Sequence, residues 1–176
     1  MEERTMTRSS AREIAIHCSY SLGFSHESAD EFLAVRLNKE NFQRWSQESA
    51  LYKEYPNEKQ LQYIKELVRG VANHGPELDQ YIAQYAKDWS FARIPLPAAA
   101  IMRVAMYEIL YMPDIPAAAA INDAVEIAKK YEDGKVVSFI NGILGAFVRA
   151  EFPEQFQDKK PARAEAEPAT EHEEEA

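Results

Sequence analysis

Hydrophobic positions along this chain recur with the period of an α-helix, and the pattern predicts a protein built from helices. The first run covers residues 9–22, where apolar side chains return every three or four positions before Gly23. Further runs begin near residues 28, 57, 76, 98, 117 and 136, and prolines at 94–97 and 113–116 mark two corners. Proline cannot continue a helix but suits its first turn, so each corner ends one helix and starts the next. Six or seven helices without a convincing strand predict an all-α bundle.

Three of the expected helices should form the centre of the bundle. The run after Pro97 is strongly apolar, with Arg103 and Glu108 as its few charges, and it is predicted to be the central helix. The two runs after Pro116 each carry one broad apolar stripe, and Gly134 separates them. Their periodicity alone favours core packing over a binding site.

The first helix is expected to have an inner and an outer face. The inner stripe consists of Ala11, Ile14, Ala15, Cys18 and Leu22. At about 100° per residue, the outer side carries Ser9, Arg12, Glu13, Ile16 and Tyr20. Large apolar side chains on an outer face are typical of a contact surface, so Ile16 and Tyr20 predict either a partner or a covering segment of this same chain.

The segment from residue 25 to 56 has the weakest pattern. After a second helix that should begin near Ser28, charged residues alternate with aromatic ones. This part is expected to be either a short helix packed by Trp45 and Tyr52 or a mobile connection. Basic residues interleaved with aromatic ones can grip single-stranded nucleic acid by stacking, but packing against the core is the favoured interpretation.

Composition places the chain among ordinary globular proteins. It has 176 residues and is 46% hydrophobic, which predicts one domain with enough length for a core. No apolar run approaches the roughly 20 residues needed to span a bilayer, and the N-terminus lacks the apolar stretch of a signal peptide. A cytoplasmic protein without a membrane partner is therefore expected.

The formal net charge of −9 is unevenly spread. Residues 157–176 carry seven acids and three bases, and they contain almost nothing apolar beyond alanine. Such a segment cannot bury enough surface to fold, so we expect an acidic disordered tail over residues 153–176. Residues 1–7 are expected to be a flexible N-terminus.

The residue types that usually mark catalysis or metal binding are absent or scattered. The single Cys18 excludes an internal disulfide and lies on the apolar stripe of the first helix, where it suits a small core filler. No histidine has a second ligand at a recognised metal spacing. The chain has no phosphate-cradling glycine loop, no G-x-S-x-G and no Glu-x-x-His pair, so neither a cofactor nor an enzyme activity is predicted.

Four stretches of the chain resemble a known family. They are A-R-E-I-A-I-H-C-S-Y at 11–20, R-V-A-M-Y-E-I-L-Y at 103–111, D-I-P-A-A-A-A-I-N-D-A-V-E-I-A-K-K-Y at 114–131 and S-F-I-N-G-I-L at 138–144. In this order they are similar to the NusB family of bacterial transcription antitermination factors. The resemblance covers most of residues 8–150, and its last two stretches are the most specific.

The resemblance implies an all-α fold of about seven helices in two small bundles, formed by residues 8–152, and a protein that is not an enzyme. NusB-like proteins pair with NusE, a small-subunit ribosomal protein. The pair binds boxA, a short single-stranded element in nascent ribosomal RNA leaders. With other Nus factors the complex rides on elongating RNA polymerase and resists premature termination.

The family's binding sites can be carried over to matching positions. The implied RNA-binding residues are Arg8, Ser9, Ser10, Arg12 and Tyr20 on the first helix, with Tyr131, Asp133, Lys135 and Phe139 in a second patch. The implied partner-binding residues are Ile16, Leu22, Trp89 and Arg93.

Several positions depart from the family pattern. Ser9 and Ser10 replace arginines of the family's basic run, His17 stands where glutamine is frequent, and Ser138 stands where lysine is common. Each lost phosphate contact weakens RNA binding and flattens its salt dependence. An alternative function therefore stays open: a scaffold that keeps the partner surface, or self-associates as a homodimer through Ile16 and Tyr20, with little RNA affinity. NusB-like domains also precede RNA methyltransferase domains, but we expect no such module because no length for it follows residue 150.

Overall fold

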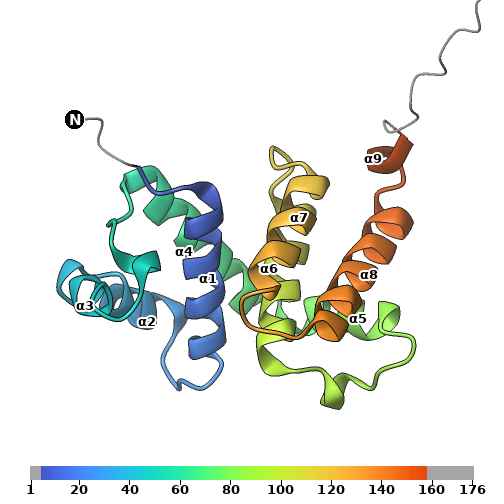
Figure 1. The fold of residues 1–176 in the computed structure, drawn as a ribbon, viewed down its shortest axis with the longest axis horizontal. Coiled ribbons are helices and arrows are strands. Elements are labelled where there is room, and N and C mark those ends of the chain that lie inside the picture. The colour runs from blue at the N-terminus through green and yellow to red at the C-terminus, as the bar shows by residue number, and fades with distance from the viewer. Residues whose placement is uncertain (1–4, 158–176) are drawn as a thin grey trace, which may run out of the picture.

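Helices account for almost all the regular structure in the computed structural model, which describes residues 5–157 (Figure 1). The α-helices are α1 Arg8–Leu22, α2 Ala29–Arg36, α3 Lys39–Trp45, α4 Glu58–Asn73, α5 Gly75–Tyr85, α6 Leu96–Tyr111, α7 Ala117–Ala128, α8 Gly134–Glu151 and α9 Glu154–Gln157. Two 3₁₀ turns, η1 Ala50–Tyr52 and η2 Phe91–Arg93, complete the element order. No strand occurs within the described residues, so the all-α prediction is confirmed.

The helix boundaries follow from capping side chains and prolines. Thr7 accepts a hydrogen bond from the Ser10 backbone N–H at the start of α1, and Asp133 accepts one from Val136 at the start of α8. Such caps satisfy backbone donors that have no partner within the helix. Pro116 immediately precedes α7, as the corner motif predicted.

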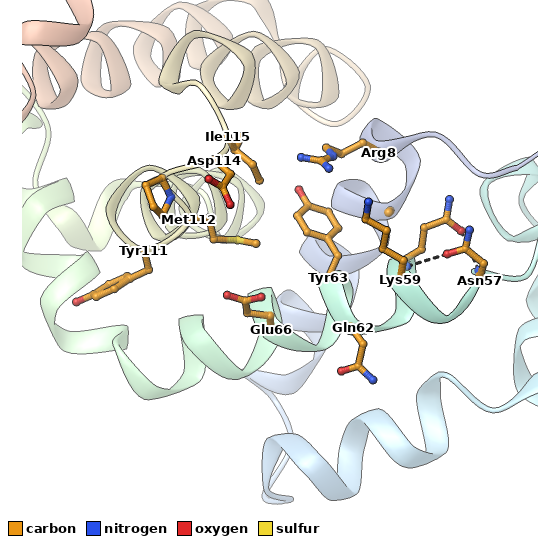
Figure 2. Close-up of a pocket in the computed structure, with 13 residues that line it drawn as sticks. Arg8, Asn57, Lys59, Gln62, Tyr63, Glu66, Tyr111, Met112, Asp114 and Ile115 are labelled. Atoms are coloured by element: carbon orange, nitrogen blue, oxygen red, sulfur yellow. Dashed lines mark hydrogen bonds between the residues drawn. The ribbon is translucent and has the colours of Figure 1, made fainter.

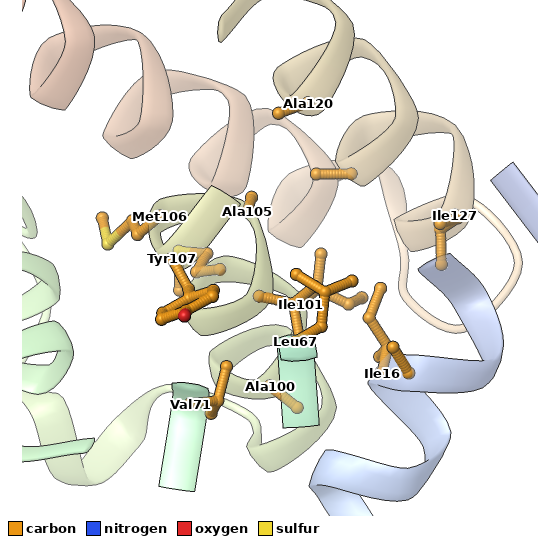
Figure 3. Packing of buried hydrophobic residues seen from close by; sticks show 14 of the residues in the cluster. Ile16, Leu67, Val71, Ala100, Ile101, Ala105, Met106, Tyr107, Ala120 and Ile127 are labelled. Atoms are coloured by element: carbon orange, nitrogen blue, oxygen red, sulfur yellow. The ribbon is translucent and has the colours of Figure 1, made fainter. Parts of the chain in front are cut away.

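The helices form two groups around α6. Helices α1 to α4 lie on one side of Figure 1 and α5 to α8 on the other, while α6 packs against α1, α4, α5, α7 and α8. Eleven of the 16 residues of α6 are buried, and Ile101 lies close to Leu67 of α4 and Ile16 of α1 (Figure 3). The prediction that this helix is central is confirmed. Within residues 5–157, no helix combines the length and apolar character needed to cross a membrane.

The predicted outer face of α1 is wrong at three of its five positions. Arg12, Glu13 and Ile16 are only 2%, 4% and 4% exposed. The cause is tertiary: α1 packs against α2, α4 and α6, and side chains from the turn after α7 contact it as well. A helix enclosed on several sides buries more than one stripe, which helical periodicity alone does not reveal.

The segment with the weakest pattern is a packed satellite of short helices. Phe42 of α3 and Tyr52 of η1 are buried, and their rings meet edge to face with centroids 5.1 Å apart. The ring centroids of Trp45 and Tyr52 are 5.5 Å apart. The short-helix alternative is therefore confirmed, and the rings serve packing rather than a nucleic-acid surface.

Ordered structure extends slightly beyond both predicted domain boundaries. Met6 is buried and Thr7 caps α1, although residues 1–7 were expected to be flexible. At the other end residues 154–157 form α9, and the Gln155 side chain accepts a hydrogen bond from the Ala117 backbone N–H at 3.1 Å. The boundaries need correction by these few residues. The remainder of both predicted segments, 1–4 and 158–176, lies outside the described residues.

Candidate functional site

The residues predicted to bind RNA fall into separate places along α1. Arg8, Ser9 and Ser10 begin the helix, whereas Tyr20 lies near its end. The 15 residues of α1 cover about 22 Å at 1.5 Å per residue. Tyr20 shares a cavity with Tyr131, which follows α7. The structure thus brings Tyr20 together with one residue of the second predicted patch, and it leaves Arg8 at the far end.

At the start of α1, Arg8 borders a cavity of about 510 Å³ between α1, α4 and the corner joining α6 to α7. Its guanidinium lies 5.5 Å from the centre of the Tyr63 ring. Lys59 lines the same cavity, and Asp114 faces Arg8 across it (Figure 2). Lys59 was missed by the sequence analysis because it stands on another helix, 51 positions further along the chain. Arg8 and Lys59 offer positive charge that can meet a phosphate, although the carboxylates of Glu66 and Asp114 line the same cavity.

Ser9 and Ser10 are half-buried beside Arg8. The Thr7 hydroxyl donates to the Ser10 hydroxyl at 2.9 Å, so Ser10 belongs to the cap of α1. Hydroxyl groups can donate to phosphate oxygens but add no charge. These two residues therefore cannot replace the electrostatic attraction of an arginine.

Arg12 does not belong to this surface. Its guanidinium donates from Nε to Glu108 Oε1 at 2.5 Å, from Nη2 to Glu108 Oε2 at 2.9 Å, and from Nη1 to Asp123. Tyr63 also donates its hydroxyl to Glu108, at 2.9 Å. Burial alone would lower the pKa of Arg12, but the hydrogen bonds and negative charge of Glu108 outweigh burial and raise it. Arg12 is thus an internal cation that ties α1 to α6 and α7, and it has no surface left to offer a phosphate.

At the other end of α1, two aromatic side chains border a cavity of about 310 Å³. Tyr20 is 37% exposed and Tyr131 is 45% exposed. The Tyr20 ring contacts Phe24 edge to face at 5.2 Å, and Phe24 is itself 65% exposed. Phe24 could not be predicted from periodicity, because it follows Gly23 and belongs to no helical stripe. Exposed aromatic faces of this kind can stack on unpaired bases.

The hydroxyl of Tyr131 is fully engaged, although its ring is exposed. It donates to Glu13 Oε1 at 2.5 Å, and His17 Nε2 lies 2.6 Å from it. Lys130 donates to the other Glu13 oxygen at 2.7 Å. Burial and the hydrogen bond to Glu13 raise the pKa of Tyr131, which keeps the phenol protonated. Tyr131 therefore offers a fixed ring to a ligand and no free hydroxyl.

The rest of the second patch merges with the predicted partner site. Phe139 of α8 packs against Trp89 with ring centroids 4.6 Å apart, and Lys135 Nζ lies 5.7 Å from the centre of the same indole. Trp89 lies beyond α5, which ends at Tyr85 and not at the proline corner of residues 94–97 as predicted. Asp133 caps α8 through its side chain. One aromatic cluster thus joins residues that the sequence analysis assigned to two surfaces.

The other predicted partner residues differ in accessibility. Arg93 is exposed on η2 and Leu22 is half-buried at the end of α1. Ile16 is packed inside the bundle, so it cannot contact a partner or a second copy without opening the fold. This corrects the partner-binding prediction for Ile16 and confirms the alternative that another segment of this chain covers it. Among residues 5–157, no three histidine, cysteine or carboxylate side chains gather in a way that could hold a metal ion.

Comparisons with known proteins agree with the helical architecture. Residues 9–149 match the sequence profile of the NusB family. A relative from Acetivibrio thermocellus, named transcription antitermination protein NusB, is 36% identical over 144 residues, which cover 82% of this chain and 90% of the relative. Among solved structures, T. maritima NusB superposes with a TM-score of 0.65 at 24% identity, covering 88% of this chain and 99% of that one. A crystal structure of antitermination factors NusB and NusE in complex with double-stranded RNA gives a TM-score of 0.59 at 23% identity, covering 81% and 96%. At these identities the two structural likenesses establish the fold.

Proposed function

Because the chain belongs to the NusB family, we propose that it is a transcription antitermination factor that binds boxA RNA together with NusE. In this role it acts by binding, not by catalysis. The complex would join other Nus factors on elongating RNA polymerase and oppose premature termination of ribosomal RNA synthesis. Such work places the protein in the cytoplasm, where nascent transcripts are made.

This proposal is supported by exposed cations at the start of α1 and exposed aromatic rings near its end. Arg8 and Lys59 border one cavity, and Tyr20 and Tyr131 border the other. Single-stranded RNA is held by cations on its phosphates and by aromatic side chains stacked on splayed bases. We assign phosphate contacts to Arg8 and Lys59, and base contacts to Tyr20 and Tyr131.

The remaining predicted RNA residues take different parts in this proposal. Lys135 offers a further cation above the Trp89 indole, and Phe139 supports that indole from α8. Asp133 fixes the start of α8, and Ser9 and Ser10 contribute hydroxyls without charge. Arg12 holds α1 in place from inside the bundle.

RNA binding should depend on the NusE partner, because few cations lie at the start of α1. With Arg12 buried and serines at positions 9 and 10, Arg8 is the one cation among residues 8–12 that can reach a phosphate. Few phosphate contacts mean weak binding by this chain alone. NusE would then supply part of the RNA surface, docking beside Trp89, Arg93 and Leu22. The alternative of a scaffold with little RNA affinity rests on the same shortage of cations.

Fluorescence anisotropy distinguishes these two functions. A labelled boxA-like RNA is titrated with the full chain, alone and with NusE, at two salt concentrations. Salt-sensitive binding that tightens with NusE supports the antitermination factor. Formation of the complex with NusE but no RNA binding in either condition would favour the scaffold, and failure to bind either molecule would reject both.

A further inference from the structure

A chain of hydrogen bonds links the buried interior to the exposed ring of Tyr131. His17 Nδ1 lies 2.9 Å from the Tyr52 hydroxyl, and His17 Nε2 lies 2.6 Å from the Tyr131 hydroxyl. Tyr131 in turn donates to Glu13, which also accepts from Lys130. The chain runs from η1 across α1 to the turn between α7 and α8. His17 is its central member and the one that touches both tyrosines.

The direction of these hydrogen bonds can be assigned. The single proton of the Tyr131 hydroxyl goes to Glu13, so His17 Nε2 must donate to the Tyr131 oxygen. In a neutral imidazole the other nitrogen is then an acceptor, and it accepts from Tyr52. Burial raises the pKa of Tyr52 to about 12, which keeps that hydroxyl protonated and able to donate. Every donor in the chain therefore meets an acceptor when His17 carries its proton on Nε2.

The surroundings of His17 favour this neutral form. The charges acting on it are Glu13 on its own helix, Arg36 from α2 and Lys130 from the turn after α7. Burial, together with the two cations, outweighs Glu13 and lowers the pKa of His17. The ionisable side chains that α4 and α6 bring against α1, Tyr63 and Glu108, contact Arg12 instead.

The chain of hydrogen bonds ends at a cavity, so it can affect how a ligand binds there. Tyr131 and Tyr20 border the same cavity, and His17 lines it as well. Tyr131 lies in the turn after α7, three positions beyond Ala128, and side-chain contacts hold its ring. His17 also contacts the Tyr131 ring edge to face, with centroids 5.5 Å apart. Hydrogen bonds and ring contact together hold the phenol against α1.

We propose that His17 is a positioning residue for RNA binding, which acts by holding the Tyr131 ring at the mouth of the cavity that Tyr20 also borders. The proposal rests on the proposed function, because Tyr131 is there assigned a base contact. Removing His17 leaves Tyr131 held by its hydrogen bond to Glu13 alone, so the ring gains freedom to turn and a stacked base loses part of a pre-oriented platform.

A double-mutant cycle on RNA affinity tests this proposal, with NusE present throughout. Dissociation constants are measured for wild type, His17→Ala, Tyr131→Ala and the double variant. We expect His17→Ala to weaken binding about 2- to 10-fold, the range of one net hydrogen bond, and to have no further effect when Tyr131 is already alanine. His17→Gln should restore most of the affinity, because its amide offers one donor and one acceptor. His26→Ala on the exposed loop after α1 is the control and should bind like wild type.

Additive losses in the cycle would overturn the proposal, since they would mean that His17 does not act through Tyr131. Circular dichroism and urea unfolding establish that each variant is folded. If wild type binds no RNA at all, the proposed function fails, and the positioning claim is tested separately by NMR. Ring signals of Tyr131, assigned with Tyr131→Phe, should show contacts to Glu13 in wild type that weaken in His17→Ala, where Glu13 alone still binds the hydroxyl. Unchanged contacts would reject the positioning role as well.

Discussion

Two neighbouring residues of α1, Arg12 and Glu13, each begin a polar network that reaches α7 or the turn after it, and the networks differ in exposure. The Arg12 network, formed with Glu108, Asp123 and Tyr63, is closed to solvent at its centre, where Arg12 is 2% and Glu108 0% exposed. In the Glu13 network, Lys130 is 60% exposed and Tyr131 45% exposed. The first network can only hold the fold together, whereas the second can hold a side chain in place and still show it to a ligand.

The largest expected effect is the loss of the buried cation. Arg12→Ala leaves Glu108 charged and without its partner inside the bundle, which should reduce the free energy of unfolding by about 3–5 kcal/mol. Urea unfolding followed by circular dichroism measures this change. Arg8→Ala, one helical turn away on the surface, is the matched control and should stay within about 0.5 kcal/mol of wild type. Equal stability of the two variants would contradict the assignment of Arg12 to the interior.

A smaller loss is expected at the edge of the same network. Tyr63→Phe removes the hydroxyl that donates to Glu108 at 2.9 Å but keeps the ring. A hydrogen bond to a charged group contributes about 1.5–3 kcal/mol, so the loss should fall below that of Arg12→Ala. The measurement is again urea unfolding, with Tyr81→Phe as the control because the Tyr81 hydroxyl makes no hydrogen bond within residues 5–157. A loss larger than that of Arg12→Ala would reverse the expected ranking.

Removing the exposed cation of the Glu13 network should matter less for stability. Lys130→Ala breaks the 2.7 Å pair with Glu13. Because Lys130 is largely exposed, the expected loss is about 0–1 kcal/mol in the free energy of unfolding. Thermal unfolding of this variant beside Lys129→Ala, whose pair with Glu126 is fully on the surface, gives the comparison. A loss of several kcal/mol would place the Glu13 network among the structural ones.

The smallest effect is a dependence of stability on pH through His17. Its pKa is lowered in the folded protein, chiefly by burial, so the unfolded chain binds a proton more readily. Stability from this source is therefore fully present above about pH 6.5, the unfolded value, and is lost as the pH falls toward the folded value. His17→Gln should remove this part of the pH dependence. Superimposable stability curves for the two proteins between pH 5 and 8 would show that His17 is not held neutral.

The sequence predicted the helices better than it predicted their faces. Helix α6 was expected at the centre because its apolar residues outnumber its charges, and packing against five other helices confirms this. The prediction for the outer face of α1 was wrong because Arg12 is buried by distant partners. These partners are Glu108 and Asp123, which lie 96 and 111 positions away along the chain. A usable signal was present at Glu108. A charge within a strongly apolar helix indicates a buried counterion.

The candidate site was predicted residue by residue only through the family resemblance. Periodicity placed Tyr20 on an outer face, and the structure leaves it 37% exposed. Lys59 and Phe24 could not be found in this way, because one belongs to a distant helix and the other to a loop. His17 was noted as a departure from the family, but its contacts with Tyr52 and Tyr131 depend on tertiary packing. Long-range neighbours of this kind are not encoded in local spacing.

In the proposed function, RNA meets the exposed start of α1 at Arg8 while Arg12 remains inside. The most direct test is the salt dependence of boxA affinity, measured with NusE for wild type and Arg8→Ala. Losing one phosphate contact on a single strand should reduce the slope of log affinity against log salt by about 0.7 and weaken binding at low salt. An unchanged slope and affinity in Arg8→Ala would contradict an RNA contact at Arg8, because RNA would then not reach this end of the helix.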